Sequence, residues 1–189
     1  MSNTDKKILI AYYSRKGQNY VNENIVDLPI GNTEVIAKKI QDINGGDLFE
    51  IATVNPYPID YTETTEVAMT ELRGNTRPEL TETIKNIDDY DIVYLGYPNW
   101  WNTFPMAVFT FLESYDFSGK TIIPFCTHEG SGLGNSERDI RKICPNAIVH
   151  HGIAIRGGTV ADADNMVSKW FMKQKTVSKK SQSHRFARC

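Results

Sequence analysis

The residues of this chain best suited to bind a ligand are two adjacent tryptophans, Trp100 and Trp101. An indole offers a flat, polarisable face on which a planar ring can stack. The pair follows an apolar run at 92–95 that is rich in β-branched and aromatic residues, a pattern typical of a buried strand. Pro98 has no N–H to donate to a sheet, so it should end that strand and leave residues 99–102 in a loop. We expect one of the two tryptophans to face a flat ligand and the other to pack beneath the next helix or to rim the site.

A second segment could bind a phosphate group. It begins at Ser14 and Gly17 and continues at Gly31, Asn32 and Thr33, where a helix is predicted to start. The first N–H groups of a helix have no partner within it, and the helix dipole favours an anion there. The alternative is that Asn32 or Thr33 only caps the helix and that Ser14 only makes a turn. The segment has neither the spacing of a P-loop nor that of a dinucleotide fingerprint.

A third segment, Thr127 to Gly132, combines a histidine and an acid with closely spaced small residues. Small residues allow the main chain to approach a ligand closely. The alternative is an ordinary connection in which His128 and Glu129 are solvated side chains.

The elements that must position these segments alternate between strands and helices. Strands are predicted at 7–13, 47–52, 91–97, 120–127 and 147–155. Helices are predicted at 33–43, 60–73, 78–86, 104–114, 135–143 and 161–172, with a long polar loop at 14–32. Right-handed crossovers place helices on both faces of a parallel sheet, which indicates a doubly wound α/β domain. All three segments follow a strand, so they should meet at the carboxyl edge of the sheet, where ligands bind.

Length and composition fit one globular domain. The chain has 189 residues, of which 40% are hydrophobic and 11% aromatic. No stretch approaches the ~20 apolar residues of a membrane span, and no secretory signal is apparent, so we expect a cytoplasmic protein without a membrane role. The three cysteines lack metal-ligand spacing, and Cys126 is expected to be an inert core thiol. We therefore predict no metal site.

The charge of the chain is unevenly distributed. Residues 173–189 carry six Lys or Arg and no acid, which leaves 15 basic and 23 acidic residues in the rest, a net charge near −8. An acidic body argues against nucleic acid as a partner. We expect a binding domain at 1–172 and a basic, solvated tail at 173–189.

At this point the chain resembles the flavodoxin-like family. The resemblance covers residues 6–172 and is carried by Tyr12-Tyr13-Ser14, by Gly31-Asn32-Thr33, by Gly96-Tyr97-Pro98-Asn99-Trp100-Trp101 and by Thr127 to Gly132. It implies a three-layer α/β sandwich with a five-stranded parallel sheet of order 2-1-3-4-5 and FMN at the switch point between strands one and three. It also implies that the first segment holds the FMN phosphate and that the isoalloxazine lies between the other two.

The residues that the resemblance assigns to FMN come from all three segments. They are Ser14, Arg15, Gly17, Asn32, Thr33, Pro98, Asn99, Trp100, Trp101, Asn102, Thr127, His128, Glu129, Gly130, Ser131 and Gly132. Among the phosphate ligands we favour Ser14, Asn32 and Thr33, because residues 16–30 separate the other candidates from the helix start. Of the two tryptophans we favour Trp100 as the stacking residue.

The expected function is that of an FMN-dependent redox protein, in which the flavin carries the chemistry. Flavodoxins often have a glycine beside the flavin N5, but loop 98–102 contains none. Non-glycine residues resist positive φ, so we expect the one-electron-reduced flavin to be poorly stabilised. This favours a two-electron reductase of quinones or similar acceptors over a one-electron carrier. Asn99 is the residue there that tolerates positive φ best.

Two other possibilities remain open from the sequence. One is a binding module that has kept the fold and lost the flavin, since fold does not determine function. The other is a one-electron carrier whose acidic body docks on a basic redox protein. The expected partners are a redox protein, or NAD(P)H and a small acceptor, with the chain as a monomer or a homodimer.

Overall fold

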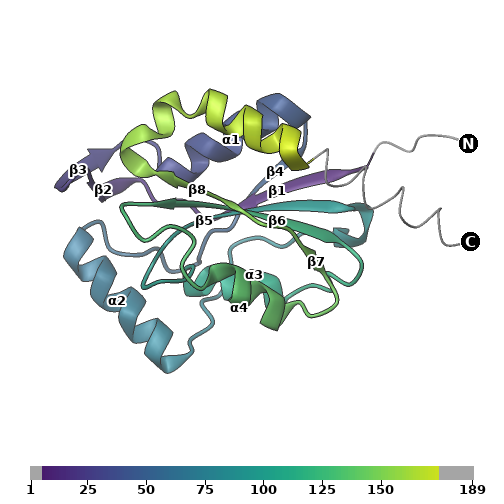
Figure 1. Cartoon of the computed structure of the whole chain (residues 1–189). Coiled ribbons are helices and arrows are strands. Elements are labelled where there is room, and N and C mark those ends of the chain that lie inside the picture. The colour runs from purple at the N-terminus through teal and green to yellow at the C-terminus, as the bar shows by residue number, and fades with distance from the viewer. Residues whose placement is uncertain (1–5, 175–189) are drawn as a thin grey trace, which may run out of the picture.

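The computed structural model describes residues 6–174, and Figure 1 shows a parallel sheet between two layers of helices. The strands of this sheet are β1 (Ile8–Tyr12), β4 (Asp47–Glu50), β5 (Ile92–Pro98), β6 (Thr121–His128), β7 (Ile148–Val149) and β8 (Ile153–Arg156). Their order is β4-β1-β5-β6-β7, and β8 also pairs with β6. All of these pairings are parallel. The predicted order 2-1-3-4-5 is confirmed, with the fifth strand in two pieces.

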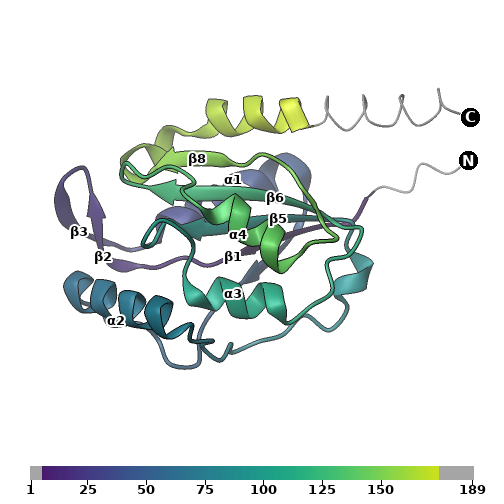
Figure 2. The same cartoon turned by 60° about the horizontal axis from the view of Figure 1, so that its bottom comes forward.

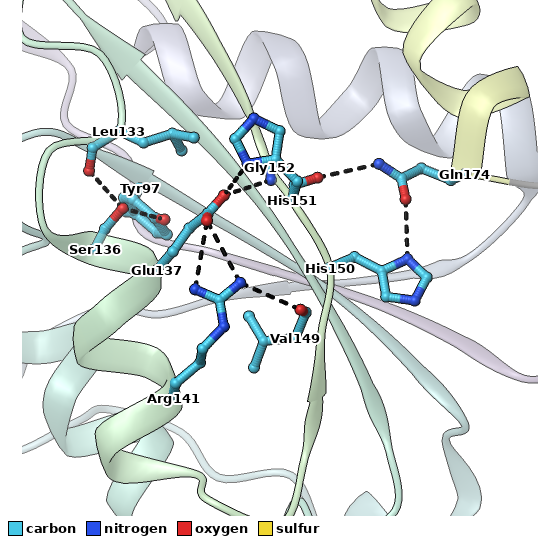
Figure 3. A network of polar contacts seen from close by, with 10 residues as sticks. All are labelled: Tyr97, Leu133, Ser136, Glu137, Arg141, Val149, His150, His151, Gly152 and Gln174. Carbon is cyan, nitrogen blue, oxygen red and sulfur yellow. Dashed lines mark hydrogen bonds and ion pairs between the residues drawn. The ribbon is translucent and has the colours of Figure 1, made fainter. Parts of the chain in front are cut away.

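The fifth strand is broken between Val149 and Ile153. Pro124 of β6 lies opposite the break and has no N–H to offer. Gly152 approaches it so closely that a Cβ at this position would lie 2.6 Å from the Pro124 carbonyl oxygen. Glu137 holds the displaced backbone: its Oε1 accepts the Gly152 N–H at 2.7 Å and lies 2.9 Å from His151 Nδ1 (Figure 3). These contacts replace regular strand pairing at the break.

Helices cover both faces of the sheet (Figure 2). One layer contains α1 (Asn32–Asn44) and the final helix at 164–174, and the other contains α2 (Tyr61–Gly74), α3 (Met106–Glu113) and α4 (Ser136–Ile143). Side chains of β1 alternate between the two layers, as a strand requires. Leu9 and Ala11 join the cluster around α3, whereas Ile10 and Tyr12 join the cluster around α1. Two apolar cores therefore fix the sheet from both sides.

The segment expected to be a long polar loop is instead a β-hairpin. β2 (Gly17–Val21) pairs antiparallel with β3 (Asn24–Leu28), apart from the main sheet. Asn22 and Glu23 form its two-residue turn with φ values of 48° and 68°. Positive φ at both central residues matches the twist of paired strands. The prediction of a loop at 14–32 was wrong because Asn-Glu is a weak turn signal compared with Asn-Gly.

The structure has no helix at 78–86, where one was predicted. A short 3₁₀ turn, η1 (Ile87–Asp89), comes directly after this segment. Leu80 forms a bridge with Thr53, and the N–H of Thr81 donates to the Ala52 carbonyl at 2.9 Å. This extended pairing gives the backbone its hydrogen bonds and places Leu80 and Ile84 against the core. Tertiary contacts therefore outweigh the local helical pattern.

The last described helix follows a 3₁₀ segment, η2 (Gly157–Asp162), and extends to residue 174. Val167, Trp170 and Phe171 from this helix are buried in the core beside α1. The basic tail predicted from residue 173 lies outside the described residues from 175 onwards. Between residues 6 and 174, no helix has both the length and the apolar character needed to span a bilayer.

Candidate functional site

A cavity of about 430 Å³ lies where the three predicted segments meet. This volume falls in the range of small-molecule binding sites. It is bounded by the start of α1, the loops after β5 and β6, the hairpin β2–β3 and α2; Figure 2 shows the hairpin and α2 beside this end of the sheet. The predicted site residues that line it are Arg15, Asn32, Thr33, Pro98, Asn99, Trp100, Trp101, Thr127, His128 and Glu129. The structure thus brings all three segments together around one space.

The first end of the cavity is the N-terminus of α1. Asn32 and Thr33 begin this helix, and the structure shows no acceptor for their N–H groups among residues 6–174. The Thr33 hydroxyl is buried and lies 2.8 Å from the Thr127 hydroxyl. Ser14 takes a capping role: its Oγ accepts the Glu34 N–H at 3.0 Å, and the side chain is not part of the cavity wall. Two main-chain donors and a hydroxyl therefore remain available to an anion.

Arg15 organises the loops beside that end. Its guanidinium donates to the carbonyl oxygens of Pro58 and Ile59, each at 2.7 Å, and to that of Gln18. Burial lowers the pKa of this group from its ordinary value. Its donors are directed mainly at main-chain oxygens, so Arg15 links the hairpin to the start of α2. Gly17 opens the hairpin with φ of 83° and lies outside the cavity wall.

The tryptophan loop forms the second wall. Trp100 makes edge-to-face contacts with Tyr13 and Tyr57, at centroid distances of 5.4 and 5.1 Å. These contacts fix the indole while it still lines the cavity. Trp101 is 49% exposed, and its Nε1 donates to the Thr65 carbonyl oxygen in α2 at 3.0 Å. Both tryptophans therefore border the cavity, Trp100 packed among tyrosines and Trp101 at the rim.

The backbone of this loop departs from the expectation based on its lack of glycine. Trp101 and Asn102 adopt φ values of 50° and 70°, whereas Asn99 does not adopt positive φ. Trp100 and Thr103 exchange two main-chain hydrogen bonds across this two-residue turn, at 2.9 and 3.1 Å. The Asn99 Oδ1 accepts the Asn102 N–H at 3.1 Å and so fastens the turn. The surrounding contacts thus hold two non-glycine residues in the left-handed region, and Asn102 lies outside the cavity wall.

The third wall is the loop after β6. His128 Nδ1 accepts the Gly130 N–H at 2.8 Å, so the neutral ring carries its proton on Nε2. Burial lowers the pKa of His128, which favours that neutral form at pH 7. Gly130, Ser131 and Gly132 are not part of the cavity wall, and the Gly132 carbonyl accepts the Asn99 side-chain N–H at 2.8 Å. These three residues shape the loop and do not border the cavity.

Several residues of the wall were not predicted from the sequence. They are Asn19, Tyr20, Tyr61, Thr64, Thr65, Ala68 and Gly157. All but Gly157 come from the hairpin or from α2. No local pattern in the sequence predicts that these two elements pack against each other. Gly157 leaves room for two polar side chains, because a Cβ would lie 2.4 Å from Asn32 Nδ2 and 2.5 Å from Glu129 Oε1.

Neither cysteine between residues 6 and 174 lines this cavity. Cys126 and Cys144 are buried free thiols, and burial raises the pKa of Cys144 to about 11 and that of Cys126 further. Within the described residues, no group of histidine, cysteine or acidic side chains is arranged to hold a metal ion.

Comparisons with known proteins agree with this geometry. A candidate flavoprotein from Bacteroides uniformis ATCC 8492 is 28% identical, with a TM-score of 0.69 over 88% of this chain and 98% of its own. One from Bacteroides eggerthii DSM 20697 is 29% identical, with a TM-score of 0.67 over 87% and 99%. A flavoprotein from Lactobacillus acidophilus NCFM, solved in complex with FMN, is 22% identical, with a TM-score of 0.59 over 85% and 99%.

No curated protein matches the chain in sequence. The family model described as flavodoxin, however, matches residues 7–174. This match spans every strand of the main sheet and all three segments around the cavity. The chain therefore belongs to the flavodoxin family.

Proposed function

We propose that this protein binds FMN noncovalently in the cavity and uses it to reduce a small, flat acceptor such as a quinone. The observation that carries the proposal is the pairing of two features in one cavity. The helix start at Asn32 and Thr33 offers unpaired N–H groups, and Trp100 offers a fixed aromatic face. The FMN complex of the structurally similar Lactobacillus acidophilus protein supports this proposal.

The residues present fit the group. The N–H donors at the start of α1 and the Thr33 hydroxyl suit a phosphate, because charge-assisted hydrogen bonds to an anion are strong there. Trp100 suits a planar ring, and the segment Thr127–Glu129 supplies main-chain and side-chain polar groups beside it. Bound FMN would supply reversible transfer of one or two electrons.

Reduction of a small acceptor is favoured by the walls around the cavity. Tyr61, Thr65 and Ala68 of α2 and Tyr20 of the hairpin extend the lining beyond the three loops. An acceptor that enters this space must be small, and aromatic walls favour a flat one. The electrons would come from an external donor such as NAD(P)H or a redox protein.

Reconstitution of the apoprotein tests the cofactor. We expect quenching of FMN fluorescence with one FMN per chain, weaker binding of riboflavin and no preference for FAD. Tighter binding of FAD than of FMN, or no binding of any flavin, would overturn the proposal and favour a flavin-free binding module.

Anaerobic titration then tests the reaction: we expect quinone to reoxidise the reduced protein in one two-electron step. Accumulation of a one-electron form at half reduction would identify an electron carrier instead.

A further inference from the structure

Glu129 joins two segments that lie far from it in the sequence. One carboxylate oxygen accepts the N–H of Asn22, at the hairpin tip, at 3.2 Å. The other accepts the N–H of Gly158, just after β8, also at 3.2 Å. The carboxylate is therefore used by two main-chain donors, one from the hairpin tip and one from the segment after β8.

The fit between these segments is close. A Cβ at Gly158 would lie 2.3 Å from Asn22 Oδ1, and a Cβ at Gly157 would lie 2.5 Å from Glu129 Oε1. Glycine at both positions leaves room for the Asn22 and Glu129 side chains to approach the backbone after β8 in this way. The Glu129 carboxylate and the Asn22 side chain thus lie directly against the backbone that follows β8.

The hairpin needs such contacts, because its two strands do not join the main sheet. An isolated two-stranded hairpin is marginally stable in water. At its base, Gln18 Oε1 accepts the Tyr61 N–H at 3.1 Å, and Arg15 donates to the Gln18 carbonyl. At its tip, the described hydrogen bond to the body of the protein is that from the Asn22 N–H to Glu129, whose other carboxylate oxygen is held by the Gly158 N–H.

Held in this position, the hairpin contributes to the cavity. Asn19 and Tyr20 of β2 line it, and the Tyr20 ring stacks on that of Tyr61, at a centroid distance of 6.0 Å and an interplanar angle of 27°. The two tyrosines form an aromatic wall contributed by the hairpin and α2 together.

We propose that Glu129 is a positioning residue that fastens the hairpin β2–β3 as a wall of the cavity, and that Tyr20 is a binding residue for the flat ligand held there. The second half rests on the proposed binding of FMN, whereas the first half concerns the protein alone. A carboxylate suits this role because charge-assisted hydrogen bonds are about twice as strong as neutral ones.

Amide hydrogen exchange of the apoprotein tests the first half. We expect Glu129→Ala to speed exchange at least tenfold at 17–28 and 156–158, with no change in β1, β5 and β6. Glu129→Gln should give exchange rates between those of the unchanged protein and of Glu129→Ala, because its single amide oxygen can still accept a hydrogen bond. Asp27→Asn is the matched control: it removes an exposed acid from the same hairpin, and the Asp27 carboxylate makes no hydrogen bond or ion pair among the described residues. Unchanged protection of the hairpin in Glu129→Ala, or an equal loss throughout the sheet, would overturn the role of Glu129.

The dissociation rate of FMN tests the second half. We expect Tyr20→Ala and Glu129→Ala each to raise this rate about tenfold, and the double variant to raise it no further than Tyr20→Ala alone. Additive effects would show that Glu129 does not act through the hairpin, and an unchanged rate in Tyr20→Ala would remove Tyr20 from the binding surface. If the protein binds no flavin, the proposed function fails while the exchange experiment still decides the role of Glu129.

Discussion

Trp100 and Trp101 are adjacent in sequence but differ in their surroundings. Trp100 packs against Tyr13 and Tyr57, whereas Trp101 is half exposed. We predict that Trp100→Ala weakens FMN binding and also lowers stability by about 3 kcal/mol. Trp101→Ala should lower the free energy of unfolding by only about 1 kcal/mol, because much of the Trp101 side chain is already exposed to water. Urea unfolding and FMN titration of both variants check this, and indistinguishable effects on affinity and spectrum would contradict the division of roles.

Thr33 is predicted to contact the phosphate although its hydroxyl already pairs with that of Thr127. A hydroxyl has one hydrogen and two lone pairs, so Thr33 can accept from Thr127 and still donate to an anion. Losing one charge-assisted hydrogen bond costs about 1.5–3 kcal/mol. Thr33→Ala should therefore weaken FMN tenfold or more and leave riboflavin nearly unchanged. An equal loss for both flavins would mean that Thr33 supports the ring or the fold.

His128 should remain neutral to a lower pH than an ordinary histidine, because burial lowers its pKa. The unfolded chain then binds a proton more readily than the folded one. The stabilising contribution of His128 is therefore complete above about pH 6.5 and is lost as the pH falls through its folded pKa. An NMR titration, with His128→Gln to assign the signal, should give a value below 6.5. A value above 6.5 would contradict this environment.

At the scale of elements, the turn of the hairpin β2–β3 contains avoidable strain. Glu23 adopts φ of 68°, which costs a non-glycine residue about 1–2 kcal/mol. Glycine removes this cost but loses more backbone entropy on folding, by about 0.5–1 kcal/mol. We predict that Glu23→Gly raises the free energy of unfolding by roughly 0.5–1 kcal/mol, as measured by urea denaturation. Gly45→Ala is the opposite control: it places a side chain at φ of 70° and should destabilise.

The elements that the sequence predicts correctly are those with a strong local pattern. The strands at 91–97 and 120–127 and the helix at 60–73 appear as β5, β6 and α2 within two residues. The hairpin is a local pairing, but its Asn-Glu turn is a weak signal in the sequence. The extended segment at 78–86 pairs with the distant residues Ala52 and Thr53, so no local pattern could show it. The same limit applies to the site. The three loops follow from the strand order, whereas Tyr20 and Tyr61 enter the cavity only through tertiary packing.

At the scale of the whole molecule, the final helix closes the core on the face of α1, away from the tryptophan loop. Val167 is fully buried there, whereas its neighbour Met166 is 48% exposed. Val167→Ala should lower the free energy of unfolding by about 2 kcal/mol, because it removes buried apolar surface and leaves a cavity in the core. Met166→Ala should change stability by less than about 0.5 kcal/mol. Urea unfolding compares the two, and equal effects would contradict the packing of this helix.

Ligand binding should stabilise the whole molecule, because the cavity is built from segments spread between residues 15 and 157. A ligand that binds only the folded chain adds about 2.7 kcal/mol to the free energy of unfolding at 100 times its dissociation constant. FMN at that concentration should therefore offset the loss expected from Val167→Ala. Val167 lies in the α1-side core and does not line the cavity, so the two effects should add within about 0.5 kcal/mol. Unfolding of both proteins with and without FMN measures this. A clear departure from additivity would show that the core beside α1 and the cavity are coupled.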